Sequence, residues 1–346
     1  MTARCHTSPA AGPGPRLAGM ELGLELSDCA ELVRITRNKV VESRHLGVAV
    51  VLDPSGQVAA VLGNPQARIF PRSALKPFQA IGSLRAGAQI SSQGTALACA
   101  SHLGTFRHQR IAEQTLEAAG LGTTDLQCPS SWPGDSATRD AMNRQGLGPG
   151  RLAFNCSGKH AAFLNAAVHS GEPTGSYLSP DHPVQRAALA AMEEFCRPIS
   201  FVGVDGCGAP APQMSLLSLA RGFGRLVSST DPQAEQVVQS IRENPWAIRG
   251  EGSANTLVIE RTGIIAKLGA EGVLAMGTPG GYSVALKMLD GSSRGTDLLA
   301  LDLLASAGAL GKEEHRQLRA ALAPAASTPG ARAAGLELAG RDFSGN

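Results

Sequence analysis

The chain of 346 residues is poor in aromatic and charged side chains, which make up 4% and 17% of it. So few aromatic rings argue against the stacking surfaces with which proteins bind single-stranded nucleic acids. The net charge is only +2, and no run of Lys or Arg is present. Neither nucleic acid nor a membrane surface is therefore expected as a partner. No apolar run reaches the roughly 20 residues that a helix needs to cross a bilayer.

A secretory signal is also missing. Residues 1–19 are rich in Pro, Gly and Ala and contain no apolar core of the kind that a signal peptide has. The chain contains seven cysteines, an odd number. Together these features predict reduced thiols in a cytoplasmic protein rather than a disulfide framework.

The hydrophobic content of 43% is enough for a large buried core. We expect a disordered extension over residues 1–25, a single domain over 26–325 and a flexible C-terminal tail over 326–346. No internal repeat divides the domain.

Strand patterns gather near the two ends of this domain, and helical patterns fill its middle. The turn signal at 53–56, Asp-Pro-Ser-Gly, joins two β-rich runs and predicts a hairpin. Strands are expected at 31–37, 47–52, 57–62, 201–204, 263–268, 273–276 and 282–288. Helices are expected at about 73–86, 94–101, 107–119, 136–144, 157–169, 184–196, 212–221, 232–243, 295–310 and 312–322. This order predicts an α/β (α+β) fold, in which N- and C-terminal strands form one antiparallel sheet flanked by helices, with a helical lobe beside it.

The segment 72–80 contains Ser-x-x-Lys followed by proline, at Ser73, Lys76 and Pro77. If a helix begins at Ser73, residues three apart share a face, and the Lys76 amine then reaches the Ser73 hydroxyl. Proline is tolerated in a first helical turn. A lysine activates a serine when burial or a second cation lowers the lysine pKa. By itself the tetrapeptide is more typical of a surface serine beside a solvated lysine, and only the other segments raise the catalytic interpretation above it.

Two further segments offer partners for this pair. Ser101 and His102 end an apolar helical pattern, where Ser101 is a candidate second hydroxyl; a helix-ending serine beside a solvent-exposed histidine is the alternative. Lys267 lies on an apolar strand between Ile265 and Leu268. A lysine there is either solvated or partly buried with a lowered pKa.

A third segment opens the helix expected at 157–169. Gly158 and Lys159 suggest a phosphate-binding loop, but Ala153 occupies the position of its first glycine and His160 that of its Ser or Thr, so we exclude this interpretation. Cys156, Lys159 and His160 instead are candidates for a metal or catalytic site. A buried structural cysteine beside an exposed lysine is the other interpretation.

Asp205 and Cys207 follow the short strand at 201–204. A carboxylate at a strand end is well placed to hold a substrate ammonium group. Cys207 and Cys156 are two thiols far apart in sequence, each at the end of an expected element. Without a Cys-x-x-Cys pair they give only a weak zinc signal.

Ser-x-x-Lys, a second serine and Lys-x-Gly on a late strand resemble serine β-lactamases and penicillin-binding proteins. The full set is closer to the Rhizobium etli inducible-type L-asparaginases, the class 3 or asparaginase II group. The resemblance covers roughly residues 30–290. It rests on five ordered motifs, at 71–77 (PRSALKP), 99–102 (CASH), 156–160 (CSGKH), 205–207 (DGC) and 267–270 (KLGA).

This resemblance implies a β-lactamase-like fold, hydrolysis of L-asparagine to L-aspartate and ammonia, and a homodimer. It also implies catalytic, substrate-binding and zinc-binding residues. The catalytic residues would be Ser73 with Lys76, and Ser101 with Lys267. Asp205 would bind the substrate α-amino group, with Arg72 and His160 lining the site. The zinc ligands would be Cys156, Lys159 and Cys207.

The expected reaction is Ser–Lys catalysis through an acyl-enzyme, in which Lys76 deprotonates Ser73 and Ser101 relays a proton; the reverse assignment of the two serines is the alternative. The chain departs from the family pattern twice, lacking a His shortly after Cys128 and an Arg at Ser253. Two other functions remain: an amidase or glutaminase acting on another small amide, and a zinc-binding member without catalysis.

Overall fold

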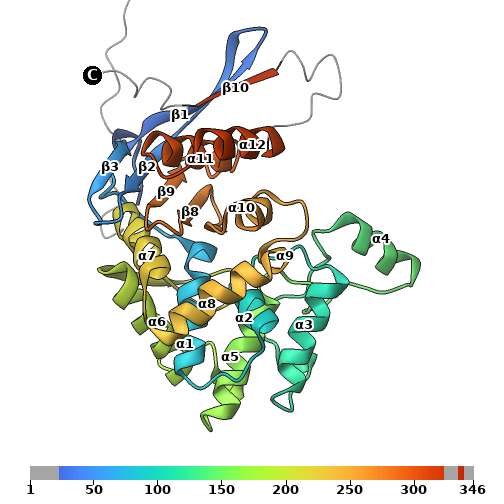
Figure 1. Ribbon diagram of the computed structural model, residues 1–346. Helices are drawn as coiled ribbons and strands as arrows, with labels where there is room; N and C mark the ends of the chain where they lie inside the picture. The colour runs from blue at the N-terminus through green and yellow to red at the C-terminus, as the bar shows by residue number, and fades with distance from the viewer. Residues whose placement is uncertain (1–22, 323–333, 339–346) are drawn as a thin grey trace, which may run out of the picture.

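The computed structural model describes residues 23–322 and 334–338. Within these ranges the strands form two sheets. The larger sheet is antiparallel throughout, with strand order β10-β1-β2-β9-β8-β7 and β3 paired to β2 (Figure 1). Its strands are β1 (Ala30–Arg37), β2 (Val40–Leu52), β3 (Val58–Leu62), β7 (Ile265–Leu268), β8 (Val273–Gly277), β9 (Ser283–Met288) and β10 (Ala334–Leu338). The predicted sheet of N- and C-terminal strands is confirmed.

The predicted hairpin joins β2 to β3. The Asp53 carboxylate accepts hydrogen bonds from the backbone N–H groups of Ser55 and Gln57, at 2.9 and 3.0 Å, which closes the turn. β2 also pairs with β9, so this N-terminal hairpin joins the C-terminal strands in the middle of the sheet.

Helices cover both faces of the sheet. β8 is buried at every position and β9 at all but one, although successive strand side chains point to opposite faces. Such continuous burial requires cover on each side. It comes from α7 (Leu216–Ser228) and α11 (Thr296–Ser306), which both pack against β8 and β9. α12 (Lys312–Leu322) packs on α11.

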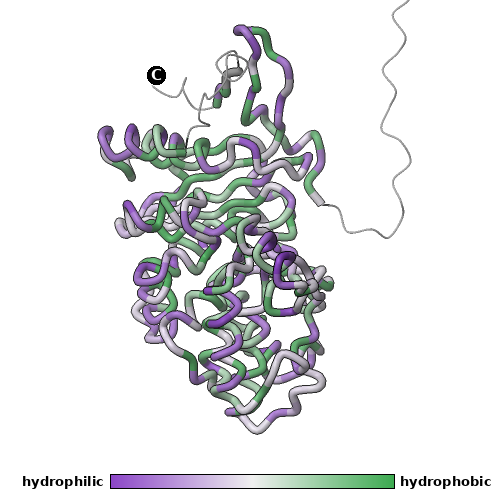
Figure 2. The backbone as a smooth tube through the Cα atoms, turned by 90° about the vertical axis from the view of Figure 1, so that its right-hand side faces the viewer, coloured by the Kyte–Doolittle hydropathy of each residue, from purple (hydrophilic) through white to green (hydrophobic). Residues whose placement is uncertain are grey.

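The remaining helices form a lobe beside the sheet (Figure 1). They are α1 (Lys76–Arg85), α2 (Ser92–Ala98), α3 (Phe106–Glu117), α4 (Ser136–Arg144), α5 (Ser157–His169), α6 (Pro183–Cys196), α8 (Pro232–Glu243) and α9 (Pro245–Ile248). α10 (Ala254–Thr262) follows α9 and packs against β7 of the sheet and against α12. Figure 2 shows hydrophilic and hydrophobic segments alternating along the outer helices, as expected where one helix face packs inward. None of the helices in the described ranges is long and apolar enough to cross a membrane.

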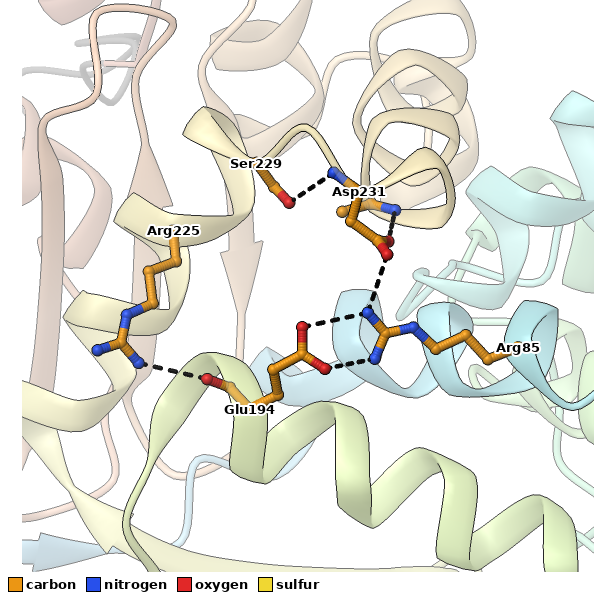
Figure 3. A network of polar contacts seen from close by, with 6 residues as sticks. Arg85, Glu194, Arg225, Ser229 and Asp231 are labelled. Atoms are coloured by element: carbon orange, nitrogen blue, oxygen red, sulfur yellow. Dashed lines mark hydrogen bonds and ion pairs between the residues drawn. The ribbon is translucent and has the colours of Figure 1, made fainter.

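Close packing and a polar network hold the helical lobe together. Gly82 of α1 lies so near α6 that a Cβ atom there would be 2.4 Å from the Cα of Ala188. At the end of α1, Arg85 donates to both carboxylate oxygens of Glu194, at 2.6 and 3.2 Å, and to the carboxylate of Asp231 at 3.1 Å (Figure 3). Arg225 of α7 donates to the Glu194 carbonyl. This network therefore connects α1, α6, α7 and the start of α8.

A second, smaller sheet brings two distant segments to one place. Its order is β4 (Arg68–Ile69), β6 (Pro210–Ser215) and β5 (Ile199–Val204). β4 leads into the turn that contains Ser73, and the β5–β6 hairpin carries Asp205 and Cys207 in its turn. The small sheet is thus the scaffold on which the Ser73 turn meets the Asp205 turn.

The structure corrects two of the predicted elements. The helix predicted at 212–221 begins only at Leu216, because residues 210–215 form β6. This strand is almost entirely buried, and its sequence, PAPQMS, contains two prolines and no alternation of apolar and polar residues, so it lacks a strand signature. The predicted tail over 326–346 contains β10, which pairs with β1. The predicted extension over 1–25 falls mostly outside the described residues.

Candidate active site

Ser73 lies in a 3₁₀ turn, Arg72–Leu75, directly before α1. The predicted α-helix therefore begins at Lys76, three residues later than expected. Arg72 adopts a φ of 53°, in the left-handed region that costs energy for a residue with a side chain. The Ser73 side chain is half-buried, and its hydroxyl has no hydrogen bond to another residue of the described ranges. Its hydroxyl therefore stands just before the start of a helix without a hydrogen-bond partner in the described part of the chain.

The Lys76 amine lies against Ser101, which the sequence assigned to the other pair. Lys76 is 1% exposed, and its Nζ donates to the Ala100 carbonyl, to Ser101 Oγ at 3.2 Å and to the Asn155 carbonyl at 3.3 Å. The expected Lys76–Ser73 hydrogen bond is not among these contacts. The two carbonyls and the Ser101 hydroxyl satisfy the donors of this buried amine instead.

Lys267 approaches the same hydroxyl from β7. Its Nζ donates to Ser101 Oγ at 2.9 Å and to the Leu268 carbonyl at 2.6 Å, and the residue is 1% exposed. Ser101 is itself 2% exposed. One buried serine hydroxyl thus lies between two buried lysine amines, which brings together three of the four predicted catalytic residues.

Burial lowers the pKa of both lysines. For Lys76, the nearby Cys156 thiolate opposes this effect and the charge of Lys159 adds to it. For Lys267, the charges of Lys76 and Arg249 add to burial and hold the pKa well below its ordinary value. Two amines this close cannot both be protonated cheaply in a buried site. At least one is therefore available as a proton acceptor.

The segment of Ser101 is fixed by contacts that the sequence pattern did not show. The Ser101 N–H donates to the Ile248 carbonyl at 3.0 Å, and the Leu103 N–H donates to the Arg249 carbonyl at 2.8 Å. The Arg249 guanidinium donates back to the Ser101 carbonyl, also at 2.8 Å. Ile248 and Arg249 thus run beside Ser101, and no sequence motif marked either residue.

His102 is buried rather than solvent-exposed. Its Nδ1 accepts from the Gly104 N–H at 3.0 Å, so its Nε2 carries the proton and donates to Ser157 Oγ, also at 3.0 Å. The ring stacks on His108, with centroids 4.9 Å apart, and His108 packs in turn on Trp246. Burial lowers the pKa of His102 well below its ordinary value. His102 is therefore a neutral residue that holds the Ser101 segment against the start of α5.

Asp205 and Arg72 form a partly buried ion pair beside the Ser73 turn. Arg72 reaches Asp205 Oδ1 through Nε at 2.8 Å and through Nη2 at 2.6 Å. The Gly206 N–H donates to the same oxygen at 2.7 Å. Burial raises the pKa of Asp205, but the charges of Lys159 and Arg72 outweigh it and hold the carboxyl below its ordinary value. Within the described ranges, Asp205 Oδ2 makes none of these contacts.

The three predicted metal ligands lie close together. Cys156 is the residue directly before α5, Lys159 is in the first turn of this helix, and Cys207 is in the β5–β6 turn with its sulfur 3.1 Å from Lys159 Nζ. The neighbouring Cys207 and the charges of Lys76 and Lys159 lower the pKa of Cys156, although burial opposes them. In the described part of the chain, no three His, Cys, Asp or Glu side chains form a group able to hold a metal ion. A site here requires the lysine as third ligand.

His160 is fully buried in α5. Its Nδ1 is 2.7 Å from the Tyr177 hydroxyl, which also accepts from the Gln127 N–H at 3.0 Å. The His160 Nε2 has no hydrogen-bond partner in the structure. His160 thus follows Lys159 in the buried first turn of α5, and its role in lining the site stays a prediction.

A protein-family model described as L-asparaginase II matches residues 33–335. The chain belongs to the L-asparaginase II family. It is therefore a hydrolase that acts on linear amides. The match extends from β1 to β10 and includes every residue of the site.

No sequence among the curated proteins matches the chain. Among solved structures, the chain is similar to a β-lactamase from Mycobacterium bovis, with 12% identity and a TM-score of 0.41 over 75% of this asparaginase-family chain and 94% of the other. It is also similar to a β-lactamase from Sphaerobacter thermophilus, with 13% identity and a TM-score of 0.40 over 77% and 93% of the two chains. These similarities carry no part of the functional argument.

Proposed function

We propose that this family member hydrolyses L-asparagine to L-aspartate and ammonia through a serine-bound acyl-enzyme. The observation that carries the proposal is the Ser101 hydroxyl between the amines of Lys76 and Lys267, 3.2 and 2.9 Å away. Lysines with lowered pKa values are the bases that a serine amidohydrolase without a histidine base needs.

The substrate ammonium group would bind at Asp205. Arg72 and the Gly206 N–H occupy only Oδ1, which leaves Oδ2 for the ligand. Because Asp205 stands beside the Ser73 turn, an amino acid held there presents its side-chain amide to the serines. Holding the reacting groups in attack geometry removes much of the entropic part of the barrier.

Ser73 would be the nucleophile, because its half-buried hydroxyl is free whereas Ser101 is held by both amines. In the substrate complex the neutral Lys76 amine takes the Ser73 proton as Ser73 Oγ bonds to the amide carbon. Ser101 passes a proton from the lysine pair to the departing nitrogen, and the C–N bond breaks to release ammonia. Water then cleaves the aspartyl ester and returns Ser73. General acid–base catalysis of this kind is typically worth about 10²–10⁴-fold in rate.

Zinc fits the chemistry of Cys156, Lys159 and Cys207. Thiolates are preferred zinc ligands, and the lysine amine is already 3.1 Å from a cysteine sulfur. These residues would hold the ion, which would join the start of α5 to the β5–β6 turn. Binding requires deprotonated ligands and would therefore release protons. We expect purified protein to contain zinc, and loss of zinc when Cys207 is replaced by Ser, both measured by elemental analysis of the folded protein.

The test of the proposed function is ammonia release from L-asparagine, with L-glutamine in parallel. We expect release from L-asparagine, and its loss in Ser73→Ala. Mass spectrometry of protein quenched during turnover assigns the acylated serine. Acylation of Ser101 in place of Ser73 would reverse the two roles, and preferred hydrolysis of L-glutamine would make the protein a glutaminase. Zinc binding without turnover or acylation would leave a metal-binding protein only.

A homodimer and a cytoplasmic location complete the proposal, as the resemblance and the reduced-thiol composition suggest. Light scattering of the purified protein measures the first.

A further inference from the structure

Arg249 is a charged residue at the site that the proposed reaction leaves without a role. It lies between α9 and α10, and its backbone carbonyl accepts from the Leu103 N–H. Its Nη1 donates to the Ser101 carbonyl at 2.8 Å. Backbone and side chain therefore both hold Arg249 beside Ser101. The position of its guanidinium is fixed by the segment that carries Ser101, the proposed proton relay.

The charge of Arg249 has no carboxylate partner within the described ranges. This distinguishes it from Arg72, which is paired with Asp205, and from Arg85, which is paired with Glu194 and Asp231. Burial lowers the pKa of Arg249, and no acidic group offsets that effect. Its charge acts on Lys267. A half-buried guanidinium without an anion is costly, and anions are what such a group binds.

Most of the hydrogen-bond donors of the Arg249 guanidinium are also unused. A guanidinium has five N–H donors arranged as a fork that matches a carboxylate, and the Ser101 carbonyl takes one of them. None of its nitrogens is among the buried polar atoms that lack a partner, so the remaining donors are open to solvent or a ligand. They lie beside the backbone of Ser101, the residue proposed to relay a proton to the departing nitrogen.

We propose that Arg249 binds the α-carboxylate of the amino-acid substrate, while Asp205 binds its α-ammonium group. The inference rests on the proposed function and narrows it to α-amino acids with a side-chain amide. A cation and an anion fixed on different segments, one beside Ser101 and the other beside Ser73, recognise both charges of such a substrate. Simple amides lack one or both of these charges.

Two truncated substrates separate this role from a purely structural one. Succinamate is asparagine without the ammonium group, and 3-aminopropanamide is asparagine without the α-carboxylate. In Arg249→Gln we expect kcat/KM to fall by about 10- to 150-fold for L-asparagine and succinamate, the range for a lost hydrogen bond to a charged group. For 3-aminopropanamide we expect no change beyond about threefold. Arg249→Lys, which keeps the charge but loses the fork, should lie between.

Arg225→Gln is the matched control, because Arg225 also donates to backbone carbonyls, those of Glu194 and Phe195. It should leave all three substrates unaffected. An equal fall in kcat for all three substrates in Arg249→Gln would mean that the residue only positions Ser101, and would overturn the proposal. Thermal unfolding of each variant shows whether it is folded. If Arg249→Gln does not fold, the same comparison of the three substrates is made with Arg249→Lys.

The inference and the proposed reaction fail in different ways. Calorimetric titration of L-asparagine into Ser73→Ala, with and without Arg249→Gln, measures binding without turnover. Binding that depends on Arg249, together with a wild-type protein that releases no ammonia from L-asparagine, would sustain the inference and overturn the reaction. Turnover of L-asparagine by wild type, with equally tight binding in the presence and absence of Arg249→Gln, would sustain the reaction and overturn the inference.

Discussion

Replacing Lys267 by Met removes one of the two amines on Ser101 with little change in side-chain volume. Lys267 is 1% exposed, and its amine has two partners, Ser101 Oγ and the Leu268 carbonyl. The substitution leaves Lys76 as the sole amine on that hydroxyl. It therefore tests whether the pair of lysines, rather than either one, makes the site reactive.

We expect a large effect on rate and a small effect on stability. Loss of a positioned acid–base group costs about 10²–10⁴-fold in kcat. Two hydrogen bonds are lost at about 1 kcal/mol each. The loss is offset because a buried amine, whose charged form burial disfavours, is replaced by an apolar side chain. A net change within about 2 kcal/mol moves the melting temperature by only a few degrees.

The stability difference should also depend on pH. Because the pKa of Lys267 is lowered in the folded protein, the unfolded chain binds more protons at pH values between that pKa and the ordinary lysine value. The free energy of unfolding contributed by this residue therefore rises with pH in that window. Lys267→Met lacks this contribution, so wild type gains stability relative to the variant as pH rises.

Ammonia release and thermal unfolding, each followed across neutral and alkaline pH, measure these effects. Lys287→Met is the matched control: Lys287 also has a pKa lowered by burial and donates to the carbonyl of the next residue, Met288, at 2.6 Å, but it does not contact Ser101. If Lys267→Met kept kcat within about threefold of wild type, the role given to the lysine pair would be refuted. A loss equal to that in Lys287→Met would point to general destabilisation.

Two further predictions concern the scaffold. Gly82→Ala should lower the free energy of unfolding by about 1–3 kcal/mol, because a Cβ at this position would lie 2.4 Å from the Cα of Ala188. Urea titrations measure this difference. A variant as stable as wild type would contradict the close approach of α1 and α6. Burial raises the pKa of Asp297 to about 6, so the folded protein binds more protons than the unfolded chain between about pH 4 and 6, and stability falls as pH rises through that window. Asp297→Asn should lack this fall, and identical pH profiles for the two proteins would exclude it.

Local patterns in the sequence predicted much of the fold. The helices at 136–144, 157–169 and 232–243 were predicted with the bounds that the structure has. Turn residues, caps and apolar periodicity mark such elements because their determinants are local. β6 and β10 were missed. β6 contains two prolines and a buried Gln, and β10 is a short strand after a Pro- and Ala-rich segment, so each acquires its structure from the strands with which it pairs.

The site was predicted as a set of residues but not as a set of contacts. Ser101, Lys76 and Lys267 do meet, yet the sequence spacing assigned Lys76 to Ser73. Helical periodicity predicts which residues share a face but not where a long, buried side chain finds its acceptors. Those acceptors are supplied by other segments, including the carbonyls of Ala100 and Asn155. Arg249 belongs to no motif, and only its missing counter-ion marks it.

The pairing of β10 with β1 has a practical consequence for handling the protein. β10 protects the outer edge of β1 over Val33–Arg37, and Leu338 is buried there. A shortened chain that ends before Ala334 would expose those backbone groups, and exposed strand edges recruit strands from other molecules. Trimming the C-terminal segment to aid crystallisation would therefore favour aggregation.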